Sequence, residues 1–133
     1  MTTINLKTIN RMYKNNGQHA EQTARFTLTG KIEKADNRPH NLGGDIGNLQ
    51  VKSARATVCT GTDLTEYLNR DGATAWGYVT EDFKTMYIMN RKEYEKFVKT
   101  FGTVTRESQK NGGNTKIRLK HESKEMREWF TER

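Results

Sequence analysis

The fold that we expect is decided by the stretch Gly43-Gly44-Asp45-Ile46-Gly47-Asn48-Leu49-Gln50-Val51-Lys52-Ser53. Gly47-Asn48 is a dipeptide typical of the two-residue turns that join antiparallel strands, so the stretch predicts a β-hairpin. In such a hairpin Asp45 pairs with Gln50, and directly opposed residues share a face of the sheet. Side chains alternate along a strand, so Gln50 and Lys52 also share a face. The stretch therefore predicts that Asp45, Gln50 and Lys52 converge on one side of a sheet.

Apolar periodicity and turn residues predict the elements on either side of this hairpin. We expect helices over residues 18–29, 62–68, 93–101 and 122–130. We expect further strands over residues 54–59, continuing the hairpin strand, and over residues 73–80, 85–89 and 115–120. Residues 1–16 are polar and basic and are expected to form an arm or a frayed first element, and residues 106–114 a polar loop. The order predicts one α/β (α+β) domain over residues 1–133, with a central mixed sheet flanked by helices.

Composition restricts the classes of function. The chain has 133 residues, a net charge of +7 and a single cysteine, Cys59. A disulfide scaffold is excluded, no apolar run approaches the length of a membrane span, and no apolar leader is visible. We therefore expect a cytoplasmic protein without a membrane partner. The excess of positive charge favours a polyanionic partner, most often a nucleic acid, although a merely soluble basic protein has the same composition.

Asp45 followed by Gln50-Val51-Lys52 resembles the D…(D/E/Q)-x-K motif of the restriction-endonuclease-like nucleases, the PD-(D/E)XK superfamily. The order of the predicted elements over residues 17–101 is similar to that family, and the predicted helix before the hairpin carries Glu21. The motif itself has only three residues. Two positions depart from the family pattern: Gln50 stands where Glu or Asp is commoner, and Gly44 stands where Pro precedes the Asp.

The resemblance implies a restriction-endonuclease-like fold and a nuclease that depends on Mg²⁺, with Mn²⁺ as a substitute. It implies metal ligands from Asp45, Gln50, the backbone carbonyl of Val51 and Glu21, the last directly or through water. Lys52 would orient the attacking water and stabilise the developing negative charge. The alternative is that Asp45 caps a glycine turn and that Gln50 and Lys52 form the solvated face of an amphipathic strand.

Basic and hydroxyl side chains outside the motif are candidates for contacts with nucleic-acid phosphates. They are Ser53, Arg55, Lys110, Lys116, Arg118 and Lys120. The last three alternate along one predicted strand, which suits a surface that follows the backbone of a nucleic acid. The alternatives are an ordinary polar strand end for Ser53 and a solvated edge strand, protected by charge against aggregation, for residues 116–120.

Together these observations favour a small Mg²⁺-dependent DNA endonuclease of restriction-like, junction-resolving or nicking type. Cutting both strands would be easiest for a homodimer. The competing hypothesis is a non-catalytic basic nucleic-acid-binding module, or a phage-encoded inhibitor of a host nucleoprotein, in which Gln50 marks a lost site. Dependence on a divalent metal discriminates between them. The aromatic residues Trp76, Tyr78, Tyr87, Trp129 and Phe130 are expected in the core.

Overall fold

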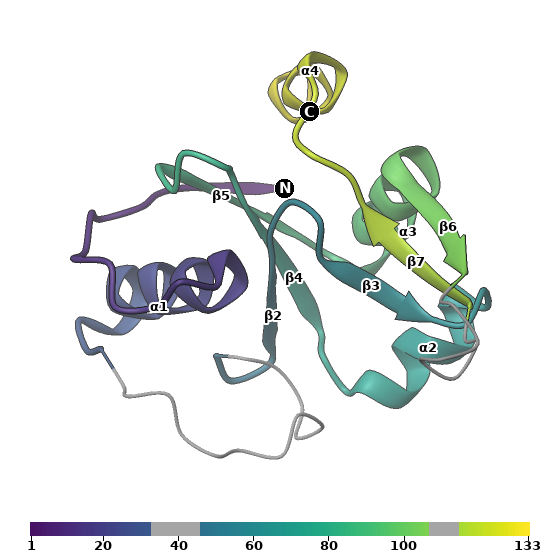
Figure 1. The fold of residues 1–133 in the computed structure, drawn as a ribbon, viewed down its shortest axis with the longest axis horizontal. Helices are drawn as coiled ribbons and strands as arrows, with labels where there is room; N and C mark the ends of the chain where they lie inside the picture. Colours follow the sequence, from purple (N-terminus) through teal and green to yellow (C-terminus); the bar gives the residue numbers. More distant parts are fainter. Residues whose placement is uncertain (33–45, 107–114) are drawn as a thin grey trace.

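The computed structural model describes residues 1–32, 46–106 and 115–133 (Figure 1). Its helices are α1 (Asn16–Thr29), α2 (Leu64–Asp71), α3 (Arg91–Phe101) and α4 (Lys124–Thr131). Its strands are β1 (Thr2–Asn5), β2 (Leu49–Lys52), β3 (Thr57–Thr60), β4 (Ala75–Val79), β5 (Thr85–Met89), β6 (Gly102–Arg106) and β7 (Thr115–Leu119). The expected mixed α/β class is confirmed.

The strands divide between two sheets. The first sheet has the order β1-β5-β4-β2, in which β2 runs parallel to β4 and the other pairs are antiparallel. The second sheet has the order β3-β7-β6 and is antiparallel throughout. In Figure 1, β2 lies between α1 and β3, so the hairpin strand stands where the two sheets meet.

The chain passes from the first sheet to the second in a tight turn after β2. The amide of Ala56 donates to the carbonyl of Ser53 at 3.2 Å, and Arg55 adopts a left-handed φ of +67°. The amide of Leu119 then donates to the carbonyl of Ala56 at 2.9 Å, which attaches the turn to β7. The prediction that residues 54–59 continue the hairpin strand is therefore wrong. The local pattern indicated an extended chain but not its partner: β2 pairs with β4, whereas β3 pairs with β7 in the other sheet.

The predicted hairpin turn is confirmed as far as the structure describes it. Ile46 and Leu49 exchange backbone hydrogen bonds of 3.0 and 2.9 Å around Gly47-Asn48. Gly47 has a φ of +58°, the left-handed value that a type II′ turn requires of its first central residue. Asp45 and its predicted pairing with Gln50 lie outside the described residues.

Helix α1 covers one face of the first sheet through small side chains. Its Asn15 cap accepts from the amide of Gly17 at 2.8 Å, and Gly30 ends it with a φ of +73°. Ala20 and Ala24 are fully buried against the sheet. The absence of larger side chains at these two positions lets the helix approach β2 and β4 closely.

The opposite face of the first sheet is covered by an aromatic core. Trp76 of β4 stacks on Tyr94 of α3, with ring centroids 5.1 Å apart, and Tyr78 stacks on Phe130 of α4 at 5.4 Å. The five aromatic residues expected in the core all belong to this cluster or pack against it, as predicted. Burial of such rings dominates core energetics, so this cluster holds α3 and α4 against the sheet.

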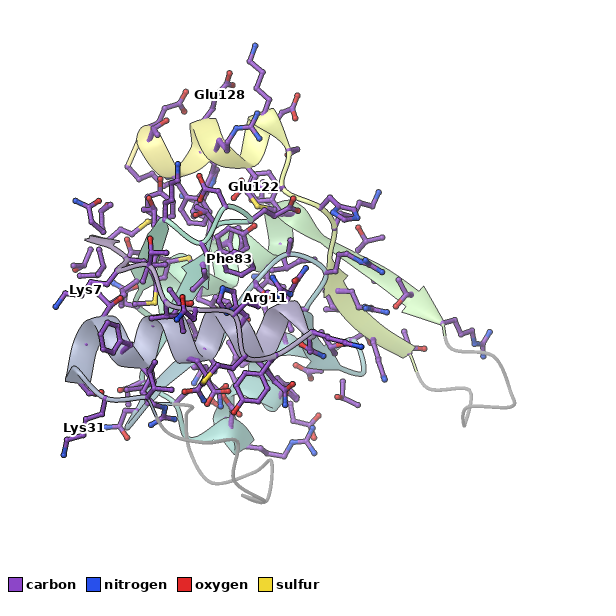
Figure 2. The ribbon with its side chains drawn as sticks, turned by 60° about the vertical axis from the view of Figure 1, so that its left-hand side comes forward. Lys7, Arg11, Lys31, Phe83, Glu122 and Glu128 are labelled. Atoms are coloured by element: carbon purple, nitrogen blue, oxygen red, sulfur yellow. The ribbon has the colours of Figure 1, made fainter. Side chains whose placement is uncertain are left out.

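The N-terminal residues are paired rather than an arm. Thr2–Asn5 form the edge strand β1, with Thr2 opposite Ile88 of β5. The next segment is held by the Arg11 guanidinium, which lies 5.7 Å from the ring centroid of Phe83 (Figure 2). The expectation of a frayed first element is thus wrong for Thr2–Asn5. These residues are mostly polar, so their sequence does not show the apolar alternation that identifies a strand.

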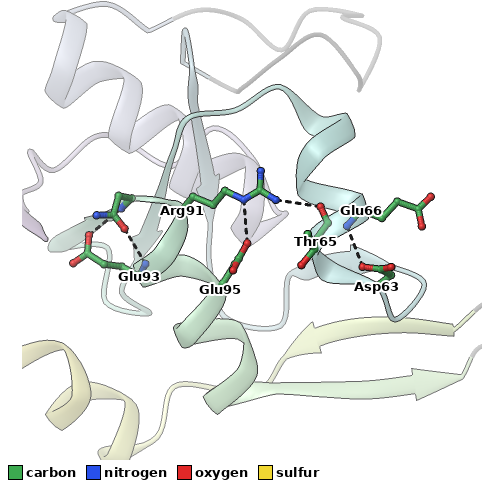
Figure 3. A network of polar contacts seen from close by, with 7 residues as sticks. Asp63, Thr65, Glu66, Arg91, Glu93 and Glu95 are labelled. Atoms are coloured by element: carbon green, nitrogen blue, oxygen red, sulfur yellow. Dashed lines mark hydrogen bonds and ion pairs between the residues drawn. The ribbon is translucent and has the colours of Figure 1, made fainter.

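Helices α2 and α3 are joined by a polar network (Figure 3). Asp63 caps α2 by accepting from the amide of Glu66 at 3.0 Å. Arg91, at the start of α3, donates to the carbonyl of Thr65 at 3.2 Å and to the carboxylate of Glu95 at 3.0 Å. These bonds fix the position of α2, which forms one wall of the site described below.

Candidate functional site

A cleft of about 700 Å³ lies at the open edge of β2. In the described part of the chain β2 is the last strand of the first sheet, and only the bridge between Ile46 and Leu49 lies beyond it. Side chains from α1, β2, β3 and α2 surround the opening. The lining residues are Asn15, Gly17, Gln18, Glu21, Gln50, Val51, Lys52, Thr60, Tyr67, Arg70 and Asp71.

Four of the residues predicted for the site line this cleft: Glu21, Gln50, Val51 and Lys52. The fifth, Asp45, lies outside the described residues. Glu21 comes from α1 and the other three from β2, elements separated by some twenty residues of chain. The structure therefore brings together every predicted catalytic or metal-ligating residue that it describes.

The register of β2 explains how two faces of the sheet contribute to one cleft. Gln50 is paired with Trp76 and Lys52 with Tyr78, so both point toward the side of the aromatic core. Glu21 belongs to α1, on the opposite side. The groups meet because β2 is an edge strand, around which the cleft extends from one face to the other. The predicted shared face of Gln50 and Lys52 is confirmed.

Lys52 stands at the junction of the two sheets. Its ammonium donates to the backbone carbonyl of Thr57 in β3 at 3.3 Å. The side chain is half-buried, with its stem beside Tyr78 and its charge in the cleft. This contact fixes a cation at the end of the cleft nearest the second sheet.

Glu21 is oriented by its own helix. Its carboxylate lies 3.2 Å from the guanidinium of Arg25, one turn further along α1. The Arg25 side chain is 10% exposed and that of Glu21 is 30% exposed. This ion pair fixes the position of the carboxylate on α1, beside the cleft that Glu21 lines.

The wall opposite β2 was not predicted from the sequence. Tyr67 and Asp71 lie one helical turn apart on α2, and Thr60 contributes from β3. Burial and the nearby Asp71 carboxylate raise the pKa of Tyr67, so its hydroxyl keeps its proton at neutral pH. The i, i+4 spacing of residues 67 and 71 was the available signal in the sequence, but the expected helix over residues 62–68 stops short of residue 71.

The cleft offers oxygen donors and cations together. Its carboxylates come from Glu21 and Asp71 and its amide oxygen from Gln50, while Lys52 and Arg70 supply positive charge. Among residues 1–32, 46–106 and 115–133, no group of three or more His, Cys, Asp or Glu is placed to hold a metal ion. That set of residue types does not cover the amide oxygen of Gln50 or the backbone carbonyl of Val51, which are the other predicted metal ligands of the cleft.

The predicted nucleic-acid contacts fall into different environments. Arg55, Arg118 and Lys120 are exposed, and Lys116 is half-buried on the same face of β7 as Arg118. Ser53 is only 7% exposed and opens onto a small cavity of about 100 Å³. Lys110 lies outside the described residues.

The alternative of a charged edge strand is wrong for β7. This strand is the central one of the second sheet, paired with β3 on one side and β6 on the other. Its cations therefore do not protect an open edge and need another explanation.

A scan against protein-family models and searches of curated proteins and of solved structures each found no significant match to this chain. In the ranges that the structure describes, no helix is both long enough and apolar enough to cross a membrane.

Proposed function

We propose that this protein is a Mg²⁺-dependent DNA endonuclease that hydrolyses phosphodiester bonds in the cleft beside β2. One observation supports the proposal above the others. The cleft gathers Glu21, Gln50, Val51 and Lys52, the residues that the resemblance to the nuclease family indicated, and two separate elements carry them.

The donor set of the cleft fits a hard divalent cation. Mg²⁺ prefers oxygen ligands and is usually held by one or two carboxylates together with water. Glu21, the side-chain oxygen of Gln50 and the carbonyl of Val51 would hold it, with Asp45 as the further carboxylate predicted by the motif. When bound, Mg²⁺ neutralises the charge of the scissile phosphate and lowers the pKa of a coordinated water.

The chain's own residues supply the remaining steps of hydrolysis. Lys52 would orient the attacking water and stabilise charge on the phosphoryl oxygens. Its hydrogen bond to the Thr57 carbonyl, at 3.3 Å, positions the side chain before substrate arrives. Tyr67 lines the opposite wall as a protonated hydroxyl, able to donate to a phosphate oxygen.

A basic nucleic-acid-binding module without catalysis, including a phage-encoded inhibitor of a host nucleoprotein, is the second candidate. The cations of β7, half-buried Lys116 and exposed Arg118, favour it, as does the neutral amide of Gln50. Such a module would bind DNA equally well with or without a divalent metal, and its affinity would fall steeply with salt. The two candidates therefore differ in their response to a chelator.

A cleavage assay decides between them. The purified protein is incubated with supercoiled plasmid, a four-way junction and single strands, each with Mg²⁺, Mn²⁺ or EDTA. We expect metal-dependent nicking or cutting that is lost in Asp45→Ala and in Glu21→Gln. Lys124→Ala, which removes an exposed cation on α4, serves as the control and should cut normally. Absence of cleavage on every substrate, with binding unaffected by EDTA, would contradict the proposal. Simultaneous cutting of both strands would indicate a homodimer.

A further inference from the structure

The second sheet has one apolar face and one polar face. Ile117 of β7 lies on the face that packs against Val98 of α3, since a Cβ on Gly102 would meet both side chains, at 2.6 Å and 3.2 Å. Because side chains alternate along a strand, Lys116 and Arg118 lie on the opposite face. In Figure 1, α3 lies behind this sheet.

Cross-strand pairing arranges the polar face in two rows. Thr57, Arg118 and Thr103 lie side by side in one row. Thr60, Lys116 and Thr105 form the next row, two residues further along β7. Each row thus has one cation flanked by two hydroxyls. The term polar face refers below to these six residues.

A β-bulge is responsible for this alignment. Thr57 and Thr60 are three residues apart and would point to opposite faces of a regular strand. The register shift between Thr57 and Cys59 inserts an extra residue, so both threonines come to lie on the polar face. Val58 and Cys59 are both fully buried as a result. The pairing of β3 is irregular at this one point, and the irregularity places Thr60 on the same face as Thr57.

The charge of the second sheet has a single sign. None of the residues of β3, β6 and β7 is acidic, whereas Arg106, Lys116 and Arg118 are cationic. Arg118 uses two of its five N–H donors on the carbonyl of Arg55, at 3.0 and 3.3 Å. A face whose strand residues include two cations and four hydroxyls and no acidic group is complementary to a polyanion.

The polar face is continuous with the cleft. Thr60 belongs to both, and Thr57 accepts the hydrogen bond from Lys52 through its carbonyl. A chain of phosphates that occupied the cleft could therefore pass directly onto the two rows.

From these observations we infer that the DNA backbone leaving the cleft lies across the polar face, with a cation and its flanking threonines contacting phosphates in each row. This inference rests on the proposed function for the polymer that occupies the cleft. It assigns Thr57, Thr60, Thr103 and Thr105 as phosphate contacts, which composition and charge alone do not indicate. It also separates binding on the second sheet from hydrolysis beside β2.

The test uses the full chain and a fluorescent duplex DNA in EDTA, where no cleavage interferes. The variant Lys116→Gln/Thr105→Val removes one cation and one hydroxyl from a single row. The matched control, Lys99→Gln/Thr100→Val, makes the same changes on the exposed part of α3, behind the sheet. Arg118 is left intact because it also holds the turn at Arg55.

We expect Lys116→Gln/Thr105→Val, called the row variant below, to bind DNA about tenfold more weakly than the natural protein. The slope of log K against log salt concentration should fall in magnitude by about one, because one phosphate contact is lost. The control should bind within about twofold of the natural protein. Unchanged affinity and slope in the row variant would overturn the inference. If the double variant does not fold, as judged by circular dichroism, Lys116→Gln alone makes the same prediction for the slope.

Failure of this inference and failure of the nuclease proposal give different results. Metal-dependent cleavage together with unchanged binding by the row variant would keep the nuclease and remove the proposed path. Weakened binding by the row variant, with no cleavage on any substrate, would support the surface and contradict the nuclease.

Discussion

Strands β2 and β7 present the same alternation of polar and apolar side chains but lie in different surroundings. β2 is an edge strand, and its polar residues share a cleft with the carboxylates of Glu21 and Asp71. β7 is a central strand, and its polar face belongs to a sheet without a single acidic residue. The comparison teaches that neighbouring elements decide the chemistry of an amphipathic strand. The cleft beside β2 holds both carboxylates and cations, which suits binding of a metal ion and stabilisation of a reacting phosphate. The polar residues of β7 carry only positive charge, which suits binding of an anion.

The largest expected effect concerns Lys52. Lys52→Ala should lower the rate of metal-dependent cleavage by about 10²–10⁴-fold, the usual contribution of a group that assists proton transfer or stabilises charge in the transition state. The affinity for DNA in EDTA should change little, because Lys116 and Arg118 remain. Lys116→Gln should do the reverse. Cleavage kinetics and binding titrations of both variants measure the contrast, and equal cleavage by Lys52→Ala would remove this residue from the mechanism.

Gly77 of β4 and Gly102 of β6 test how closely the neighbouring side chains and backbone pack against each sheet. A Cβ on Gly102 would lie 2.5 Å from the carbonyl oxygen of Val98, which is backbone and cannot yield. A Cβ on Gly77 would lie 2.7 Å from the sulfur of Met86, a flexible side chain. We expect Gly102→Ala to lower the free energy of unfolding by about 3 kcal/mol and Gly77→Ala by about 1 kcal/mol. Urea denaturation measures both, and a reversed order would contradict this account of the packing.

A smaller effect is expected at Gln50. Gln50→Glu adds a charged oxygen ligand to the cleft and should tighten Mg²⁺ binding by about tenfold, or about 1.4 kcal/mol. Calorimetry in the Lys52→Ala background measures this without cleavage. Thr105→Glu places the same charge on the polar face of the second sheet and should create no metal site. Equal Mg²⁺ affinity before and after Gln50→Glu would show that residue 50 is not a ligand.

The smallest effect concerns the one half-buried carboxylate that follows β7. Burial, together with the nearby charge of Glu81, raises the pKa of Glu122 above its ordinary 4.5, although the neighbouring Tyr78 hydroxyl opposes the shift. The folded state therefore holds this proton more tightly than the unfolded state, and stability falls as the pH rises from the ordinary value through the raised pKa.

Glu122→Gln removes this loss. The variant should melt at a higher temperature than the natural protein at pH 7, and the difference should shrink as the pH falls below 4.5. Glu132→Gln, at an exposed carboxylate, is the control and should show a smaller change. A constant difference between Glu122→Gln and the natural protein at all pH values would mean that titration of Glu122 is not its cause.

Local patterns predicted the helices and the hairpin because their signals lie within a few residues. Helices α1 and α3 end before Gly30 and Gly102, at the residues expected, whereas α2 continues to Asp71, three residues beyond the expected end. The Gly47-Asn48 turn fixes the alternation of β2. The division into two sheets could not be predicted, since it depends on pairing between β3 and β7, which are far apart in sequence.

The same limit applies to the candidate site. Gln50 and Lys52 were identified by spacing within one strand, and Glu21 by its place on the preceding helix. Asp71 was overlooked because only the packing of α2 against β3 brings it to the cleft. The threonines of the polar face were overlooked because a bulge, invisible in the sequence pattern, reverses the direction expected for Thr60 relative to Thr57.

The turn at Arg55 sets the distance between the place where the polymer would be cut and the place where it would be held. Its left-handed φ of +67° and the two hydrogen bonds from Arg118 hold the connection between β2 and β3 in one short, tight conformation. One inserted residue lengthens a strand connection by about 3.3 Å, close to the rise of one base pair, about 3.4 Å. A glycine inserted after Arg55 should therefore move the cleavage position by about one nucleotide relative to the bound segment, which end-labelled cleavage mapping would reveal. If the proposed function holds, the length of this turn would set the distance between the cut phosphodiester and the bound segment.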